Sequence, residues 1–272
     1  MSPPRVAVIQ FPGVNCEAET VRALERAGLA AGVFCWTRPA RELGGFEAYV
    51  LPGGFSWQDR VRAGALSAKD PLVQALAEEA GARGKPVLGI CNGAQVLVEA
   101  GLVPGGEGVV LALATNRMSA RSGYYSRWVH VRVERSACVF TRGLAPGTVL
   151  PLPVAHGEGR FTSGAAGRIA TLLEAGQVPL RYATAAGEVA DAFPEDPNGS
   201  ELAAAAVCNA AGNVLAMMPH PERALDLGAL SRAIPGEWAA QRERACEDGA
   251  GVAAAGPGLV LFEGLRRHLE EA

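Results

Sequence analysis

The first ninety residues alternate between short apolar runs and longer segments that carry one apolar face. The apolar runs predict four buried strands, at 5–11, 33–36, 48–51 and 86–90. The segments between and after them predict three helices: one capped by Asn15 and ended by Gly28, one from Asp70 to about Ala82, and one from Cys91 to Gly101. Strands without polar alternation, separated by helices, are typical of a parallel sheet covered on both faces. The pattern therefore predicts an α/β fold whose ligand site lies at the carboxyl ends of the strands.

From about residue 105 to 220 the pattern changes. Residues 127–133 alternate polar and apolar side chains, as does a strand with one solvated face, and 209–213 separate two apolar runs like a hairpin loop. This half predicts an added mixed or antiparallel portion. Leucines and a phenylalanine at helical spacing predict an amphipathic C-terminal helix from 259, after a Gly/Ala-rich stretch at 247–258 that indicates a flexible connector. We expect a single domain, 1–272, in which about 226–272 form a C-terminal extension with that helix.

Composition excludes several classes of protein. With 272 residues, 49% of them hydrophobic and 19% charged, the chain is long and apolar enough to form one large folded domain. Its 25 basic and 28 acidic residues leave no excess that would favour nucleic acid. No apolar run approaches the roughly 20 residues that span a bilayer, and the start of the chain does not resemble a signal peptide. The six scattered cysteines form no C-x-x-C pair. We therefore expect a cytoplasmic protein with reduced thiols, no bound metal, and neither nucleic acid nor membrane as a partner.

The candidate nucleophile is Cys91, within Gly89-Ile90-Cys91-Asn92-Gly93. An apolar strand precedes this segment and a helix follows it, which is the context of a nucleophile elbow. The glycines permit a tight turn that exposes the sulfur above the sheet, at the positive end of the helix. The alternative is a core cysteine in a glycine-rich turn. Cys16, at another strand-to-helix turn, is the rival nucleophile, although its turn lacks comparable oxyanion donors.

Two further segments strengthen this hypothesis. In Met217-Met218-Pro219-His220-Pro221-Glu222, residues that precede proline are held extended, so His220 and Glu222 can point the same way. An imidazole with a carboxylate behind it is a general base with its orienting group. Gly53 and Gly54 follow a strand and expose backbone N–H groups, which with the N–H of Asn92 would form an oxyanion hole. Taken alone, the first segment is also compatible with a proline-rich surface loop and the second with an ordinary turn.

Four motifs in order give the chain a family resemblance. They are P-G-G-F-S-W at 52–57, G-I-C-N-G-A-Q-V-L-V-E-A-G-L-V-P-G at 89–105, P-V-A-H-G-E-G-R-F at 153–161 and M-M-P-H-P-E-R at 217–223. Together they resemble the class I glutamine amidotransferases and, more narrowly, the glutaminase subunits of phosphoribosylformylglycinamidine synthase, an enzyme of de novo purine synthesis. The similarity spans about residues 4–225. Gln58, before Asp59, departs from the glycine that is common in the family, and about 45 residues follow the last motif.

The resemblance implies roles for the matching positions. Cys91 would attack the carboxamide of glutamine and form a glutamyl thioester, while His220 moves protons and Glu222 orients it. Gly54 and Asn92 would form the oxyanion hole. The substrate-binding residues that the resemblance implies for glutamine are Gly53, Gln95 and His156.

The resemblance also implies a partner. The chain has no G-x-x-x-x-G-K-[ST] phosphate loop, so we expect the ATP-dependent step on another polypeptide. This chain would carry no cofactor, and ATP and Mg would be used by a synthetase subunit that converts formylglycinamide ribonucleotide to formylglycinamidine ribonucleotide. A small accessory subunit would complete the complex.

Two other functions remain as alternatives. A stand-alone cysteine hydrolase of the α/β-hydrolase type would have its acid before its histidine, whereas Glu222 follows His220. A non-catalytic scaffold subunit would not need an intact cysteine, histidine and glutamate.

Overall fold

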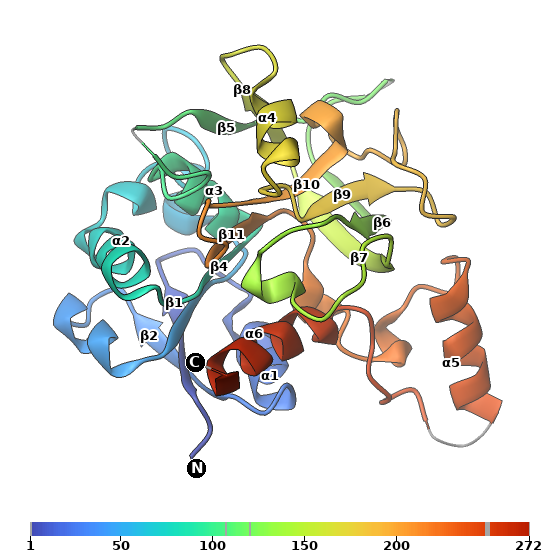
Figure 1. Ribbon diagram of the computed structural model, residues 1–272, viewed down its shortest axis with the longest axis horizontal. Helices are drawn as coiled ribbons and strands as arrows, with labels where there is room; N and C mark the ends of the chain where they lie inside the picture. Colours follow the sequence, from blue (N-terminus) through green and yellow to red (C-terminus); the bar gives the residue numbers. More distant parts are fainter. Residues whose placement is uncertain (1, 107, 120, 248–250, 272) are drawn as a thin grey trace.

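In the computed structural model, which describes residues 2–271 except 107, 120 and 248–250, nine strands form one sheet (Figure 1). The order across the sheet is β2-β1-β3-β4-β11-β10-β9-β6-β7. The parallel half contains β1 (Arg5–Gln10), β2 (Ala30–Cys35), β3 (Ala48–Leu51), β4 (Val87–Ile90) and β11 (Val214–Met217). The antiparallel half contains β10 (Ala204–Cys208), β9 (Leu180–Ala183), β6 (Tyr125–Val133) and β7 (Val149–His156). The predicted parallel sheet with an antiparallel portion is confirmed, and the two portions are continuous.

A separate two-stranded sheet lies over one end of the molecule. It pairs β5 (Leu111–Ala114) with β8 (Arg160–Ser163) in antiparallel register. Neither of these strands was predicted from the sequence, nor were β7 and β9. The predicted hairpin is confirmed, because β10 and β11 pair antiparallel on either side of residues 209–213.

Helices cover both faces of the parallel half (Figure 1). They are α1 (Glu17–Arg26), α2 (Pro71–Arg83), α3 (Asn92–Glu99) and α6 (Leu259–Glu271). Two further helices lie away from this half: α4 (Arg168–Glu174), which packs on β8, and α5 (Glu237–Glu247). The crossovers that contain α1 and α2 run in opposite directions across the sheet. Because such crossovers are right-handed, the two helices lie on opposite faces. Helix α6 packs beside α1, and this covering explains why β1, β3 and β4 have buried side chains on both sides.

Helix α2 begins and ends as its sequence predicts. The Asp70 carboxylate accepts the N–H of Leu72 at 2.8 Å, Pro71 occupies the first turn, and Gly84 adopts the left-handed conformation after the last turn. The predicted cap of α1 is wrong. That helix starts at Glu17, one residue later than an Asn15 cap allows, and no side chain caps it.

The C-terminal segment divides into two parts. Helix α5, which was not predicted, stands at the edge of the molecule (Figure 1) on a small apolar cluster of its own, made of Leu227, Leu230, Ile234 and Ala245. Helix α6 was predicted, and it returns to the main core with its apolar side buried.

We predicted a flexible connector at 247–258. Residues 248–250 lie outside the described residues, and the prediction is wrong for residues 251–258, which make regular backbone hydrogen bonds. Gly228 N–H donates to Val252 O at 2.8 Å and Leu227 N–H donates to Ala254 O at 3.0 Å. Gly256 in this stretch also permits close backbone packing, because a Cβ there would lie 2.6 Å from Ala224 O.

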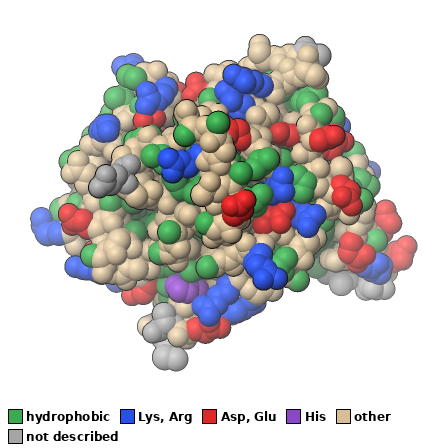
Figure 2. Space-filling model, turned by 45° about the horizontal axis from the view of Figure 1, so that its top comes forward, with side chains coloured by type: hydrophobic (Ala, Val, Ile, Leu, Met, Phe, Trp, Pro, Cys, Tyr) green, Lys and Arg blue, Asp and Glu red, His purple; other side chains and the backbone are tan. Residues whose placement is uncertain are grey.

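On the face shown in Figure 2, basic and acidic side chains are interspersed. Within the described residues, no helix has the length and apolar character needed to cross a membrane.

Candidate active site

Cys91 occupies a strained turn between β4 and α3. Its φ of 51° and ψ of −104° lie in a region that side-chain-bearing residues rarely adopt. The flanking glycines permit the close approach of strand and helix. A Cβ on Gly89 would lie 2.6 Å from Leu97 Cδ1, and one on Gly93 would lie 1.9 Å from Leu51 O. The elbow predicted from the sequence is therefore present. It lies at the carboxyl ends of the parallel strands and directs the sulfur to that side.

His220 comes to the same edge because β11 is the parallel neighbour of β4. Cys91 N–H donates to Met217 O at 2.8 Å, and His220 N–H donates to Pro153 O at 2.8 Å. Cys91 and His220 line one small cavity of about 60 Å³. The structure thus brings the candidate nucleophile and the candidate base together from segments far apart in the sequence.

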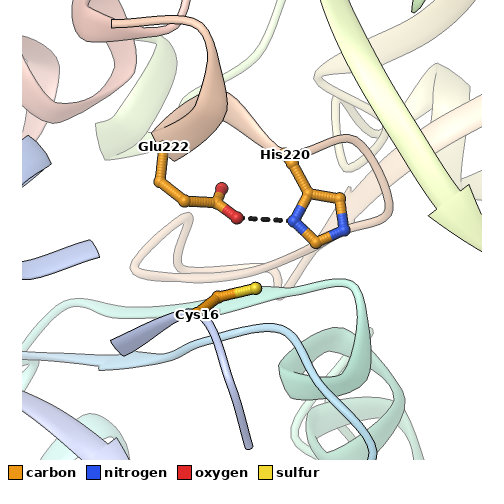
Figure 3. A group of neighbouring side chains, drawn as sticks. All are labelled: Cys16, His220 and Glu222. Carbon is orange, nitrogen blue, oxygen red and sulfur yellow. Dashed lines mark hydrogen bonds and ion pairs between the residues drawn. The ribbon is translucent and has the colours of Figure 1, made fainter. Parts of the chain in front are cut away.

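Glu222 lies directly behind the imidazole (Figure 3). His220 Nδ1 and Glu222 Oε1 are 2.5 Å apart, and both side chains are buried. Burial lowers the pKa of His220, but the negative charges of Glu222 and Cys91 outweigh it and hold that pKa well above its ordinary value. His220 Nε2 has no hydrogen-bond partner within the described part of the chain. The imidazole is therefore oriented at one nitrogen and available for proton transfer at the other.

The residues expected to form the oxyanion hole lie beside the sulfur. Gly54 lines the same cavities as Cys91. Its φ is +147°, and a Cβ there would lie 2.6 Å from Val14 Cα, so the position requires glycine. Asn92 supplies the first N–H of α3, whose N-terminal end favours negative charge. Their role as oxyanion donors stays a prediction that this placement favours.

A second cavity, of about 210 Å³, extends from the sulfur. Its lining residues are Gly54, Phe55, Asp59, Ala63, Cys91, Gln95, Tyr124, Ala155, His156, Gly157 and Glu158. Gln95 and His156 thus line a space next to Cys91, and their contact with glutamine stays a prediction. Gln95, however, has both ends of its amide engaged by protein, since Nε2 donates to Glu158 O at 2.7 Å and Oε1 accepts from Asn92 at 2.9 Å.

Gly53 is placed differently. It is not among the residues that line the larger cavity, and its absent side chain makes room for His220. A Cβ at this position would lie 2.7 Å from His220 Cε1 and 3.2 Å from Cys16 Sγ. The structure therefore gives Gly53 a packing role behind the imidazole, and direct contact with glutamine stays a prediction.

Comparison with known proteins identifies the family. The sequence model of a protein family, the CobB/CobQ-like glutamine amidotransferase domain, matches residues 3–262 of this chain. The chain is 43% identical over 274 residues to phosphoribosylformylglycinamidine synthase subunit PurQ of Methanothrix thermoacetophila, with 98% of both chains covered. It is 45% identical over 225 residues to PurQ of Thermus thermophilus, with 82% of this chain and 90% of the relative covered. The chain belongs to the PurQ family of glutamine amidotransferases.

Solved structures agree with this assignment. The chain resembles one in the structure of PurLQS from Thermotoga maritima, with a TM-score of 0.66, 32% identity, and coverage of 92% of this chain and 100% of that one. A GMP synthase protein from Thermoplasma acidophilum shares the fold, at 14% identity and a TM-score of 0.54, with 100% of this chain and 96% of that one covered. The predicted membership in the class I amidotransferases, and more narrowly in the PurQ family, is confirmed.

Sequence reasoning missed several residues of this PurQ-family site. Asp59 and Glu158 line the larger cavity, where burial and then the charge of Glu158 raise the pKa of Asp59. The motif at 153–161 contains Glu158 and resembles the family's loop near the glutamine pocket, whereas Asp59, just after the motif at 52–57, was given no role. Tyr124 lies outside every motif, yet its ring is 6.5 Å from that of Phe55 at the cavity rim. No local signal in the sequence announces that contact.

The Asn92 side chain was also missed as a structural link. Its Oδ1 accepts the N–H of Ser56 at 3.0 Å, and its Nδ2 donates to Asp59 at 3.3 Å. Asn92 thereby connects the elbow to the turn after β3. In that turn, non-glycine residues that include Trp57 and Gln58 adopt the left-handed backbone conformation. Such strain is typical of functional sites.

One group at the site has donor atoms of the kind that bind metals. Cys16, His220 and Glu222 offer atoms that all lie within 4.8 Å of one another (Figure 3). The Arg223 guanidinium, however, donates to Cys16 Sγ at 3.0 Å. The permanent positive charge of a guanidinium so close to these donor atoms disfavours a divalent cation there. The donor set therefore fits a network of charges around His220 better than a metal centre.

Proposed function

We propose that this chain is the glutaminase subunit of phosphoribosylformylglycinamidine synthase. It hydrolyses glutamine and passes ammonia to a synthetase that converts formylglycinamide ribonucleotide to formylglycinamidine ribonucleotide in purine biosynthesis. The observation that carries the proposal is the arrangement of Cys91, His220 and Glu222 at one sheet edge, in a chain of the PurQ family. A cavity beside the sulfur provides space for a substrate.

The chemistry follows from the positions of these groups. The Cys91 sulfur, whose proton has passed to His220 Nε2, attacks the carboxamide carbon of glutamine and forms a tetrahedral intermediate. The N–H groups of Gly54 and Asn92 stabilise the oxyanion, and one such donor is typically worth about 3–4 kcal/mol. His220 then gives its proton to the departing nitrogen. Ammonia leaves and a glutamyl thioester remains on Cys91.

Hydrolysis of the thioester reverses these roles. His220 takes a proton from water, the resulting hydroxide attacks the thioester carbon, and the tetrahedral intermediate expels the Cys91 sulfur, which recovers the proton. Glutamate is released and the enzyme is regenerated. Throughout, Glu222 holds the imidazole at Nδ1 and stabilises its charged form. The raised pKa of His220 favours the protonated state that the departing ammonia requires.

The ammonia is used by a second polypeptide. The name of the Thermotoga structure, PurLQS, joins PurQ with two further components. The corresponding partners of this chain are the synthetase and a small accessory protein. ATP and Mg belong to the synthetase, because this sequence lacks the phosphate loop that would cradle a nucleotide.

The experiment separates glutamine use from synthesis. In the assembled enzyme, Cys91→Ala should lower glutamine-driven synthesis by more than about a thousandfold, whereas synthesis from added ammonium salt should continue at the wild-type rate. Cys246→Ala removes an exposed cysteine of α5 and should leave both rates unchanged. Glutamine-driven synthesis that persists in Cys91→Ala would refute the proposed function.

A further inference from the structure

The second cysteine near the active site has contacts that the triad of Cys91, His220 and Glu222 does not explain. Cys16 lies in the turn between β1 and α1, its side chain is 1% exposed, and its sulfur faces His220 and Glu222 (Figure 3). Arg223 Nη2 donates to that sulfur at 3.0 Å. The same guanidinium approaches the triad carboxylate less closely, with Arg223 Nε 3.9 Å from Glu222 Oε1.

We propose that Cys16 is a positioning residue, whose sulfur holds the Arg223 guanidinium away from Glu222 and so reserves that carboxylate for the catalytic His220. The inference rests on the proposed glutaminase function and assigns it a further residue pair. The Cys16 sulfur also contacts the His220 imidazole and contributes to its raised pKa. The role proposed here acts through Arg223 and Glu222, and Cys16 takes no part in the bond changes at Cys91.

Two cationic groups can compete for one buried carboxylate. Glu222 Oε1 is 2.5 Å from His220 Nδ1, while Glu222 Oε2 is buried and has no partner within the described residues. A guanidinium binds both oxygens of a carboxylate strongly when it can reach them. Arg223 is within a short movement of that arrangement, and its side chain is 39% exposed, so it has room to move. The Cys16 sulfur offers the guanidinium an alternative acceptor.

The consequence of losing that acceptor is electrostatic. If Arg223 paired with Glu222 through both oxygens, its positive charge would neutralise the carboxylate that now supports the imidazolium. His220 would then hold a proton less readily, and the departing ammonia would lose its proton source. The separation of 3.9 Å between Arg223 and Glu222 is therefore part of the catalytic arrangement.

The surrounding contacts hold Cys16 in place. Its N–H donates to Gly53 O at 3.3 Å, and Thr20 Oγ1 donates to its carbonyl oxygen at 2.7 Å. Its thiol donates to Asn15 Oδ1 at 3.3 Å, which leaves a sulfur lone pair for Arg223. Cys16 and Arg223 line the small cavity that Cys91 and His220 share, but not the larger cavity that provides space for glutamine. Changes at these two positions should therefore alter kcat for glutamine more than KM.

The test is a double-mutant cycle in the assembled synthase, with glutamine and with ammonium salt as the nitrogen source. We expect Cys16→Ala to lower glutamine-driven kcat roughly tenfold to a hundredfold, a smaller loss than that from a triad carboxylate, with KM changed less than about twofold. Cys16→Ser should retain most of the rate, because a hydroxyl also accepts from Arg223. The decisive variant is Cys16→Ala combined with Arg223→Gln. It should have the rate of Arg223→Gln alone, and both variants should be faster than Cys16→Ala, since the competing charge is gone.

Other outcomes are equally definite. If the double variant is as slow as Cys16→Ala, or slower, Arg223 does not compete for Glu222 and the inference is overturned. Equal losses with glutamine and ammonium salt would also overturn it, because they would show that Cys16→Ala damages the fold or the assembly instead. Cys91→Ala, measured alongside, separates the two proposals. Its inactivity with glutamine, together with a wild-type rate for Cys16→Ala, would reject this inference while leaving the glutaminase function intact.

Discussion

Two buried histidines at the active site are driven toward opposite charge states. Burial penalises the charged form of both. Beside His220, the Glu222 carboxylate reverses that penalty and raises its pKa well above the ordinary value. His156 instead meets the neutral amide of Asn116, whose Oδ1 is 3.1 Å from Nδ1, and burial and the charge of His220 lower its pKa to about 3. The choice of amide or carboxylate as partner decides which histidine can carry a proton.

This difference predicts a pH dependence of stability. The unfolded chain protonates His156 below about 6.5, whereas the folded chain excludes that proton down to about 3. The free energy of unfolding should therefore fall as pH decreases from 6.5 toward 3, with a contribution of up to about 1.4 kcal/mol per pH unit from this residue. His156→Gln should remove that part of the slope, as measured by urea unfolding between pH 7 and 5.

His268→Gln is the control, because His268 is a partly exposed residue of α6 and should contribute a smaller slope. Identical pH slopes in His156→Gln and the unchanged protein would contradict the assignment of a neutral His156.

At the scale of elements, the sheet order assembles the site. The neighbouring parallel strands β3, β4 and β11 end at Gly53-Gly54, Cys91 and the His220 segment, so three short motifs meet at one edge. The segment that carries His220 and Glu222 packs closely against the residues just before α6. A Cβ on Gly258 would lie 2.0 Å from Pro221 O and 2.8 Å from Pro221 C.

Gly258→Ala should therefore disturb catalysis through packing. The added methyl group must displace Pro221, which lies between His220 and Glu222, and overpacking of this kind typically costs about 1–3 kcal/mol. We expect a fall of roughly tenfold or more in glutamine-driven kcat, since small displacements of catalytic groups reduce rates strongly. Steady-state kinetics with glutamine and ammonium salt, together with thermal unfolding, measure the two effects.

Gly164→Ala is a matched control, because a Cβ there meets nothing within 4 Å. If Gly258→Ala turned glutamine over as fast as Gly164→Ala, α6 would not support the catalytic turn.

Element boundaries were predictable where local signals act alone. The Asp70-Pro71 start of α2 belongs to this class. The predicted cap of α1 was wrong, because Asn15 packs against the turn that follows β3. The Asn15 N–H donates to Gly53 O of that turn at 3.2 Å. Helix α5 was missed because Ala245 is its only buried residue, so its sequence carries no apolar stripe.

At the scale of the whole molecule, the two C-terminal helices differ in their importance. Helix α6 buries four apolar side chains in the main core: Leu259, Leu261, Phe262 and Leu265. Each typically contributes about 1.5–3 kcal/mol, and their sum is comparable to the net stability of a domain, about 5–15 kcal/mol. Helix α5 is tied to the body by few contacts, among them Trp238 Nε1 to Val149 O at 3.1 Å.

We expect a chain that stops at residue 257 to lose its cooperative thermal transition. A chain in which a short Gly-Ser linker replaces residues 236–250 should stay folded, with a Tm lowered by about 2–8 °C. It loses a small apolar contact and the hydrogen bonds of Trp238 and Arg242 to backbone oxygens outside the segment. Circular dichroism and gel filtration of both chains make the comparison. Loss of the fold in the linker chain would show that α5 belongs to the main cooperative unit.

The sequence by itself determined the parallel half of the fold, the elbow at Cys91 and the pairing of His220 with Glu222. Each depends on a short window of residues, in which apolar runs, glycine turns and prolines act locally. Only the tertiary structure decided that β11 lies beside β4, that Asn116 holds His156, and that Cys16 binds Arg223 behind the triad. These contacts join segments far apart in the chain, and the charge of a buried group depends on every neighbour that folding brings to it.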